Sequence, residues 1–528
     1  MGQAAWTHHD KSAPQADTCS QVQQDLWYAE RLELPGAGAH LALALRIHGD
    51  LDEAALRAAC ADLVEAQPDL LSRFPARQGR PERTPLDDDA ARRAVEVVRL
   101  ADEAAVSGHL RAPFDLDTGP LLRFGVTDEG GRTTLLAVFH HLVADGSSRD
   151  LIAQEWIRCH RARRHGQRPV LRPAEAYQRH VDRERALLAN GPPPGWRDAF
   201  AWDGAAISDV LHSPPDAVAS PVAVRLGVDR SARLGTLAED YGVSRHAVLL
   251  ASFAATLASY ATAPGPDVPP VAVPMGTRTA EFAGTVGPFV NEAPLRLAPG
   301  RRDNFGTFLR RVRQQTATAY RFRSFPLTDL RRRVGSTPWR PSVVFGYRRA
   351  GLPERIRTPE LTVDYQAVVP VGHTSAELEL QLLDRGTDLG GWLDYDPARF
   401  AAGPLRDVLD HWYRMIDLVT AAPDRPLRSL CVLDERQQRR VGALSTGPEV
   451  RFDGPDTVHD LIAAQAAATP EGVAVRDDGR SVSYAELDRD TSRVAGLLAA
   501  AGVRADQPVL VCVPRSVGLV AALLGVWR

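Results

Sequence analysis

Two histidines and an aspartate stand close together at residues 139–146, which read FHHLVADG. A neutral imidazole can accept a proton from a reacting group, and a carboxylate can hold a neighbouring group in place. The apolar run at 135–139 predicts a buried strand, and the following residues predict a helix over 147–162 with Ser147 or Ser148 as its N-cap. The three side chains are therefore expected where a core strand turns into a helix.

The two histidines, His140 and His141, are expected to have different tasks. A histidine on an apolar strand is more often a core residue than a catalyst, but adjacent residues of a strand point to opposite faces. One imidazole can therefore serve the scaffold while the other faces a cleft. Asp145 can reach back to a backbone group or to an arginine, which makes it a positioning residue. Gly146 would permit an unusual dihedral and the close approach of a ligand to the backbone before the helix begins.

Length and composition indicate a large globular chain. Its 528 residues, 44% of them hydrophobic, suffice for two or three compact units. The 63 basic and 66 acidic residues give a net charge of −3, so no overall field favours nucleic acid or an anionic membrane as a partner. No apolar segment is long enough to span a bilayer, and the N-terminal residues lack a signal-peptide core. The sequence therefore predicts a cytoplasmic protein.

Cysteine and lysine usage excludes several chemistries. The five cysteines lie far apart without metal-ligand or redox spacing, so we expect reduced, structural thiols and no metal site. The only lysine is Lys11, in the polar N-terminal tail. A phosphate-loop, Schiff-base or adenylate-binding lysine would have to be this residue, which stands outside any strand-turn-helix context. We expect none of these chemistries.

The order of the expected elements divides the chain into five parts. Two α/β halves are separated by the run NGPPPGW, which is too rich in proline and glycine for the interior of an element. The expected parts are a disordered tail at 1–17, the two halves at 18–190 and 191–430, a linker at 431–456 and the start of a further α/β unit at 457–528.

Motifs spread over residues 18–430 resemble those of the condensation domains of nonribosomal peptide synthetases, relatives of chloramphenicol acetyltransferase. The matches are the core motif His140-His141-x-x-x-Asp145-Gly146, the opening motif Ser20-x-x-Gln23-x-x-Leu26-Trp27, Tyr177 with the following RERALLA, and the floor-loop motif Gly287-Pro288-Phe289-Val290-Asn291. The resemblance implies an α/β fold of two chloramphenicol acetyltransferase-like lobes, which form a V with a central tunnel.

The resemblance also implies a reaction and its partners. In this family an acceptor amine attacks a donor thioester, giving an amide and a free carrier thiol. Donor and acceptor carrier proteins deliver the substrates on phosphopantetheine arms, and other synthetase subunits are further partners. No cofactor of the domain's own, no nucleic acid and no membrane are implied.

The same resemblance gives roles to the site residues. His141 would accept the ammonium proton or hold the amine in line, while backbone N–H groups near Gly146 would stabilise the oxyanion. His140, Asp145 and Arg278 would support the site. The tunnel and floor-loop residues would be Gly287, Pro288, Phe289 and Asn291.

One arginine of the family pattern is missing. The family usually has an Arg-His-Glu-x-Leu-Arg run after the first helix, whereas this chain has AQPDLL at 66–71. If that arginine braces the active-site loop, Arg73 or Arg278 must replace it. We expect Arg278 to be the partner of Asp145.

Residues 457–528 resemble the first part of an amino-acid adenylation domain. The matching stretches are VHDLIAAQAAATPEGVAV, SYAEL at 483–487 and VLVCVPRSVGLVAALLGVW. They cover only the start of that domain and include no catalytic lysine, so we expect no adenylation activity from this part.

Other activities share the fold. Epimerisation domains carry the same histidine motif, but their Glu-Gly-His-Gly-Arg run is absent here and the floor-loop match favours condensation. Heterocyclising relatives replace the histidine pair with aspartate, and acyltransferases that use free coenzyme A carry an Asp-Phe-Gly-Trp-Gly segment that this chain lacks. A non-catalytic recruitment domain is a further alternative, against which the intact motif argues.

Overall fold

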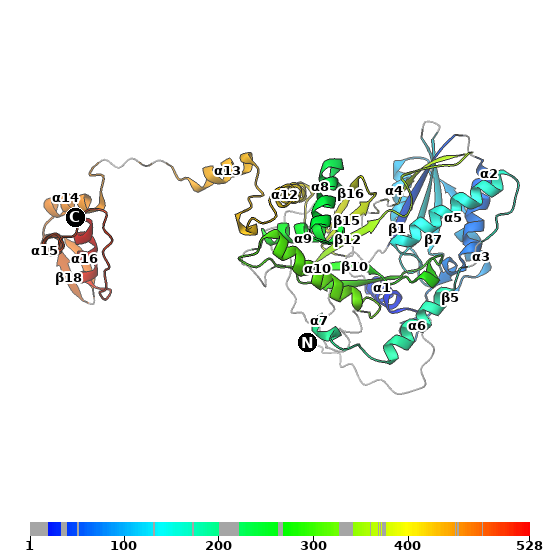
Figure 1. Ribbon diagram of the computed structural model, residues 1–528, viewed down its shortest axis with the longest axis horizontal. Coiled ribbons are helices and arrows are strands. Elements are labelled where there is room, and N and C mark those ends of the chain that lie inside the picture. The colour runs from blue at the N-terminus through cyan, green and yellow to red at the C-terminus, as the bar shows by residue number, and fades with distance from the viewer. Residues whose placement is uncertain are drawn as a thin grey trace. The chain divides into compact units, whose positions relative to one another are not determined.

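The computed structural model divides the chain into two compact units, Met1–Asp434 and Glu435–Arg528 (Figure 1). The tail predicted at 1–17, including Lys11, lies outside the residues that the structure describes. The described residues are 19–32, 40–49, 52–129, 132–171, 174–199, 221–261, 268–326, 342–359, 361–367, 369, 371, 376–448, 450, 454–477 and 479–528.

The first sheet contains six strands in the order β13-β14-β1-β8-β7-β6. Their bounds are β1 His40–His48, β6 Val97–Arg99, β7 Leu122–Glu129, β8 Arg132–His140, β13 Arg355–Arg357 and β14 Thr362–Gln366. Helices α2 (Glu53–Ala66) and α5 (Gly146–Arg164) pack against each other and cover this sheet (Figure 1). Strands β13 and β14 belong to the second half of the chain, so the second half contributes two strands to the sheet of the first half.

Strand β8 has an apolar sequence because it lies inside the first sheet. It pairs with β1 on one side and β7 on the other, both antiparallel. Residues 135–140 are all buried, whereas a strand with one solvent-exposed face would alternate. The predicted strand before the histidine pair is therefore present, and its end position is fixed by two neighbours.

Helix α5 begins at Gly146, with Asp145 as its N-cap. The Asp145 carboxylate accepts the backbone N–H of Ser148 at 2.7 Å and so satisfies one of the free donors of the first turn. The prediction of Ser147 or Ser148 as the cap was therefore wrong, because the preceding carboxylate reaches the same donor.

The second sheet also has six strands, in the order β11-β10-β12-β15-β16-β9. Their bounds are β9 Val222–Arg225, β10 Val271–Gly276, β11 Val290–Leu295, β12 Val343–Arg349, β15 Leu378–Asp384 and β16 Leu389–Tyr395. The helices of this lobe are α8 Gly227–Asp240, α9 Arg245–Ala258, α10 Phe305–Arg321 and α12 Ala402–Ala421. Helix α9 contacts the other three and is buried from Ala247 to Leu257, which explains its apolar sequence on every face.

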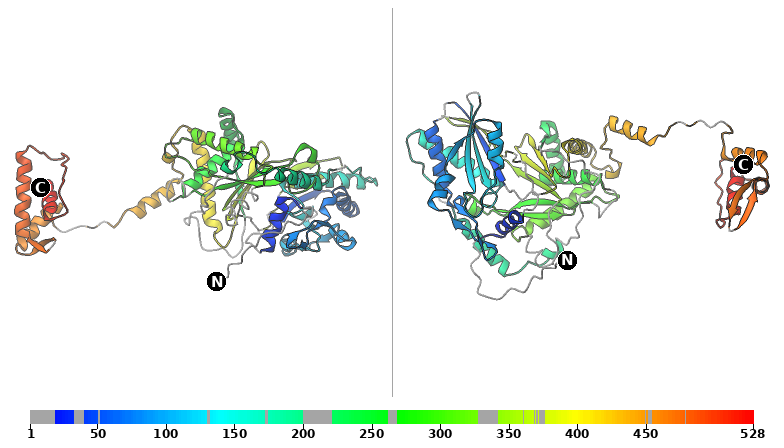
Figure 2. Two further views of the ribbon diagram at one scale, coloured as in Figure 1. Left: turned by 90° about the horizontal axis from the view of Figure 1, so that it is seen from below. Right: turned by 180° about the vertical axis from the view of Figure 1, so that it is seen from behind.

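Shorter elements connect the two lobes, which lie side by side in each view (Figure 1, Figure 2). Helix α1 spans Gln21–Arg31 and α6 spans Tyr177–Ala189. The other elements of this unit are α3 Asp88–Ala94, α4 Glu103–Arg111, α7 Trp196–Ala199, short strands β2 Ser72–Arg73, β3 Ala76–Arg77, β4 Arg80–Pro81 and β5 Thr84–Pro85, and 3-10 turns at Pro68–Leu70, Ala280–Phe282 and Leu427–Ser429.

The second unit is small. Its elements are α13 Glu435–Ser445, α14 Val458–Ala468, β17 Val473–Asp477, β18 Arg480–Ser483, α15 Tyr484–Ala500 and α16 Val517–Trp527. Helix α13 lies within the predicted linker and has no buried residue. A small apolar core joins the sheet to α15 and α16; it comprises Val482, Leu487, Val517, Ala521 and Leu524.

The cysteines are unpaired, as the sequence predicts. Cys19, Cys60 and Cys159 are buried, and Cys431 and Cys512 are exposed. Burial raises the pKa of Cys60 and that of Cys159 to about 12, so the buried thiols are not reactive thiolates. Among the described residues there is no cluster of histidine, cysteine or acidic side chains placed to hold a metal ion. No helix in the described part of the chain combines the length and apolar character that crossing a membrane requires.

Candidate active site

His140 ends strand β8 and is completely buried. Its Nδ1 accepts the backbone N–H of Leu142 at 3.0 Å, and its Nε2 faces Glu30 Oε2 at 3.4 Å. The proton therefore resides on Nε2, which donates to the Glu30 carboxylate. The rings of His40 and Phe114 pack against it edge to face. These contacts fix the end of the strand and the course of the turn.

His141 follows directly and is partly exposed. Its Nδ1 is buried and forms no hydrogen bond with another described residue. Burial lowers the pKa of this imidazole below 6.5, the His140 and Arg149 side chains lower it further, and the Asp145 carboxylate and its own carbonyl oppose the shift. The ring is therefore neutral at pH 7 and keeps a free lone pair. The expected difference between the two histidines is present. His140 is buried and hydrogen-bonded, whereas His141 is partly exposed and its Nδ1 has no hydrogen bond with another described residue.

Asp145 joins the two lobes through four donors. Its carboxylate accepts both the backbone N–H and the hydroxyl of Ser148 at 2.7 Å, the backbone N–H of Phe289 at 3.0 Å, and Nη2 of Arg278 at 3.1 and 3.2 Å. The Ser148 hydroxyl also lies 3.1 Å from the carbonyl oxygen and 3.2 Å from the backbone nitrogen of Gly287. We call Asp145, Ser148, Arg278, Gly287 and Phe289 the Asp145 clamp.

Arg278 is the arginine that pairs with Asp145. Its Nη1 donates to the carbonyl oxygens of Phe282 and Thr285, and its guanidinium carbon lies 4.1 Å from the centre of the Phe289 ring. Arg278 therefore holds both the loop between β10 and β11 and the cap of α5. Arg73, the alternative partner, donates to the carbonyl oxygens of Pro85 and Asp117 instead.

The floor loop is packed against Tyr177 from helix α6. A Cβ atom on Gly287 would lie 2.4 Å from Cδ2 of the Tyr177 ring, so only glycine fits there. The Tyr177 hydroxyl donates to the carbonyl of Pro288 at 2.9 Å and shares a hydrogen bond with the Ser20 hydroxyl at 2.9 Å. The opening motif and the floor-loop motif thus meet at Tyr177, which itself belongs to a third matched motif.

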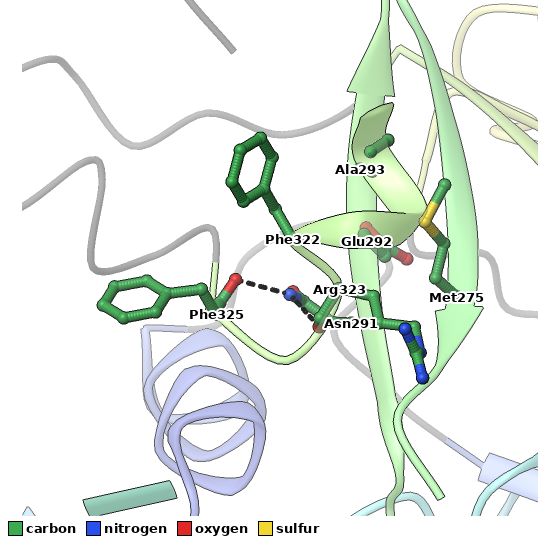
Figure 3. A pocket seen from close by; sticks show the side chains of 8 residues that line it. Met275, Asn291, Glu292, Ala293, Phe322, Arg323 and Phe325 are labelled. Carbon is green, nitrogen blue, oxygen red and sulfur yellow. Dashed lines mark hydrogen bonds between the residues drawn. The ribbon is translucent and has the colours of Figure 1, made fainter. Parts of the chain in front are cut away.

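Asn291 lies apart from the clamp, at a pocket beside strand β11 (Figure 3). Its Nδ2 donates to the carbonyl oxygens of Arg323 and Phe325 at 2.9 and 2.8 Å. The pocket is lined by Met275, Asn291, Glu292, Ala293, Ala319, Phe322, Arg323 and Phe325. The amide therefore ties the strand to the segment after α10.

Gly146 has an ordinary backbone conformation, because its φ angle is not positive. The unusual dihedral that glycine would permit here is therefore not adopted. A Cβ atom at this position would lie 3.4 Å from Nη2 of Arg149 and 3.9 Å from Cδ of Arg348. Two arginine side chains therefore lie over the first turn of α5.

Two glutamines position the site and were not identified from the sequence as doing so. Gln23 Nε2 donates to the carbonyl of Leu142 at 2.8 Å, one residue after His141. Gln67 donates to the carbonyl of Gly284 at 3.0 Å and accepts the backbone N–H of Val286 at 3.1 Å. Gln23 belongs to a matched motif, which was a signal, whereas Gln67 lies in the segment that departs from the family pattern.

Arg149 is a further residue that sequence reasoning missed. It lies on α5 four residues after Asp145, a spacing that places two helical residues on the same face. That spacing was the available signal. Its guanidinium is buried and interacts electrostatically with His141.

Comparison with known protein families agrees with this geometry. The model of the condensation domain matches residues 15–441, and the model of the AMP-binding enzyme family matches residues 462–528. Two relatives are the phosphinothricin tripeptide synthetase PhsB of Streptomyces viridochromogenes, 30% identical over 96% of this chain and 45% of its own length, and the probable non-canonical nonribosomal peptide synthetase CymA of Salinispora arenicola, 28% identical over 96% of this chain and 7% of its own length. The chain thus spans less than half the length of these relatives.

Solved structures show the same fold. The X-domain from teicoplanin biosynthesis is 20% identical, with a TM-score of 0.67 over 80% of this chain and 99% of its own. The first condensation domain of the calcium-dependent antibiotic synthetase, in complex with a substrate analogue, is 21% identical, with a TM-score of 0.66 over 80% of this chain and 100% of its own. The predicted fold, two chloramphenicol acetyltransferase-like α/β lobes followed by a partial AMP-binding region, is confirmed. The chain therefore belongs to the condensation domain family of nonribosomal peptide synthetases.

Proposed function

We propose that the first unit forms an amide bond between two carrier-bound substrates. The donor is an acyl or peptidyl thioester and the acceptor is the amine of an aminoacyl thioester. The observation that carries this proposal is the contrast at the start of α5, where a neutral His141, whose Nδ1 has no hydrogen bond with another described residue, stands beside the fully bonded Asp145 carboxylate. A base held on a rigid frame, with its lone pair free, suits a proton transfer between bound reactants.

The proposed reaction follows from these parts. The acceptor nitrogen attacks the thioester carbon, and His141 accepts the proton that the nitrogen loses or holds the amine in line. Backbone N–H groups at the start of α5 stabilise the oxyanion. The carbon–sulfur bond then breaks, and the leaving sulfur takes the proton to become the carrier thiol. Holding two tethered reactants in line can supply up to about 7–11 kcal/mol of the barrier reduction.

The partners that we propose are donor and acceptor carrier proteins with phosphopantetheine arms, within a synthetase of several subunits. The synthetase relatives support this assignment, as does a starter condensation domain of rhizomide synthetase that was crystallised with C8-CoA and Leu-SNAC. We propose no intrinsic cofactor for the chain. The cytoplasmic location remains a prediction from the sequence. We also propose that residues 457–528 do not form an acyl adenylate, because the chain contains no lysine beyond Lys11.

The test is product analysis with loaded carriers. Donor and acceptor carriers bearing a set of acyl and aminoacyl groups are mixed with the full chain, and mass spectrometry detects the amide on the acceptor carrier. We expect product with the unchanged chain and none above background with His141→Ala. Absence of product with every pair would overturn the proposal.

Two outcomes would identify the alternatives. Incorporation of deuterium at the α-carbon of a single loaded carrier in deuterated water would indicate epimerisation. Stable binding of another biosynthetic enzyme without turnover would indicate a recruitment domain; the teicoplanin X-domain has been solved in complex with OxyB.

A further inference from the structure

Arg149 is a buried cation with no bonded partner in the described part of the chain. Its side chain is 8% exposed, its Nε is buried, and the guanidinium forms no hydrogen bond or ion pair with any described residue. Buried arginines are normally paired with a carboxylate, because an uncompensated charge inside a protein is costly. The missing counterion therefore calls for an explanation.

The nearby carboxylates are committed elsewhere. Asp145 is bonded within the clamp. Asp150 accepts Nη1 of Arg348 at 2.5 Å, the hydroxyl of Tyr365 at 2.6 Å and the backbone N–H of Gly351 at 3.2 Å. Two carboxylates thus lie near Arg149, but neither forms an ion pair or hydrogen bond with it.

A second arginine adds to the positive charge at the same place. Arg348 on β12 uses Nη1 for Asp150, while its Nη2 is buried and has no partner among the described residues. Burial and then the charge of Arg348 lower the pKa of Arg149 to about 10, so Arg149 is still charged at pH 7. Both side chains lie over Gly146, where the start of α5 contributes a further partial positive charge. Three sources of positive charge, the two guanidinium groups and the N-terminus of α5, therefore lie close together. The two guanidinium groups have N–H donors without an acceptor in the described part of the chain.

The anion that fits belongs to the acyl part of a substrate. Arg149 is an electrostatic neighbour of His141, where we place the thioester carbon. The phosphate of a pantetheine arm is separated from its thioester by the length of the arm, so it is not the group that reaches Arg149. A guanidinium binds a carboxylate with two parallel hydrogen bonds, which a neutral amide of the same shape cannot match.

We propose that this site accepts a carrier-bound substrate with a carboxylate on its acyl or aminoacyl chain, and that Arg149 and Arg348 bind that carboxylate. The proposal rests on the proposed function and names the substrate class of the same site. It makes Arg149 a specificity-determining residue.

The kinetic test uses pairs of substrates that differ only in charge. On the donor side, succinyl is compared with succinamyl; on the acceptor side, aspartyl is compared with asparaginyl. We expect the unchanged chain to use the carboxylate of one pair at least about tenfold faster, and Arg149→Gln to bring that ratio close to one. The pair that shows the effect identifies the substrate concerned. Equal rates in the unchanged chain, or a preference that persists in Arg149→Gln, would overturn the proposal.

Two variants serve as controls. Arg149→Lys retains the charge but not the two-pronged geometry, so it should keep part of the preference. Arg313 on α10 is exposed and has no bonded partner among the described residues, so Arg313→Gln should leave both rate and preference unchanged.

A binding measurement separates this proposal from the proposed function. Calorimetric titration compares the N-acetylcysteamine thioesters of succinate and succinamate, and of aspartate and asparagine, with the unchanged chain and with Arg149→Gln. If no pair yields an amide product, the proposed function fails and the binding ratios alone decide the present inference. Tighter binding of a carboxylate that is lost in Arg149→Gln supports it. Equal affinities for both members of each pair refute it.

Discussion

The two sides of the first turn of α5 differ in how far their buried polar groups are hydrogen-bonded. On one side the Asp145 clamp uses every oxygen of its carboxylate and ties the cap of the helix to the loop of the other lobe. On the other side, His141, Arg149 and Arg348 keep buried nitrogen atoms without a partner in the described part of the chain. The two sets of residues meet at the start of one helix.

This difference indicates two roles: the bonded groups position the site, and the unpartnered groups are available to bind a ligand. Buried polar groups are nearly always satisfied in native proteins, because an unmet donor or acceptor costs stability. The Asp145 carboxylate follows that rule, and its bonds make the turn rigid. The groups on the unpartnered side depart from this rule, which is typical of groups that bind a ligand. Substitutions on the two sides should therefore act on different quantities, the free energy of unfolding on one and activity on the other.

The largest effect should come from His141→Ala. Loss of a general base typically slows a reaction by about 10²–10⁴-fold. The unfolding temperature should not fall, because the imidazole forms no hydrogen bond with another described residue. Initial rates with loaded carriers and a thermal melt measure both. The exposed His165 provides a control: His165→Ala should retain full activity, and equal activity in His141→Ala would end the assignment of a proton acceptor.

Asp145→Ala should instead destabilise the protein. It leaves the Arg278 guanidinium and the backbone N–H of Phe289 without their acceptor. Removing one member of a buried ion pair costs about 3–5 kcal/mol, so urea unfolding should shift clearly to lower concentration, and activity should fall with it. Asp388 is exposed in a turn, and Asp388→Ala should change neither. Unchanged stability together with lost activity would show that Asp145 takes part in the chemistry itself.

A smaller loss is expected for Gly287→Ala. The added methyl group would overlap the Tyr177 ring, and overpacking of this kind costs about 1–3 kcal/mol. The overlap disappears when Tyr177 is shortened, so the two changes should not be additive. A double-mutant cycle with Tyr177→Leu, followed by denaturant unfolding, measures the coupling. Simple additivity would mean that the ring moves aside without cost.

The smallest effect should be a gain in stability from Arg149→Met. Replacing this buried cation, which has no partner among the described residues, with an apolar side chain of similar length should raise the free energy of unfolding by about 1 kcal/mol. A loss of stability would show that Arg149 has a structural role, and it would remove the contrast between the two sides of the turn.

The same substitution should alter the titration of His141. Arg149 lowers the pKa of that imidazole, so Arg149→Met should raise it, as ring-proton NMR would detect. Since the folded pKa lies below 6.5, the unfolded chain binds more protons as the pH falls below 6.5, and His141 then reduces stability. Arg149→Met should lessen that acid-induced loss. An unchanged titration would show that the two groups are not neighbours.

Local pattern predicted the strand, the turn and the helix around the histidine pair. These elements follow from short-range periodicity, which a buried strand such as β8 displays directly in its residues. The pairing of Arg278 with Asp145 came from a family resemblance, since the two residues are 133 positions apart in the sequence. The cap of α5 was misassigned because three neighbouring polar residues could each have filled that position.

Other features depend on contacts that no local pattern encodes. The bonds of Gln67 join residues more than 200 positions apart, and the pairing of β1 with β14 joins residues more than 300 apart. The unpaired state of Arg149 depends on where Asp150 turns, which only the packed lobes determine. The sequence therefore identified the residues of the Asp145 clamp more readily than Arg149, which is distinguished by the lack of a partner among the described residues.

The pairing of β14 with β1 has a consequence for synthesis on the ribosome. Strand β1 emerges early, but its outer edge is covered by residues 362–366, and by Val369, which donates its backbone N–H to the carbonyl of Ala42. Until those residues have been translated, the nascent chain exposes an unpaired strand edge, a surface on which polypeptides aggregate. Polypeptides that stop between the two lobes would leave that edge open permanently, so the first lobe should not be obtainable by itself as a stable, monomeric protein.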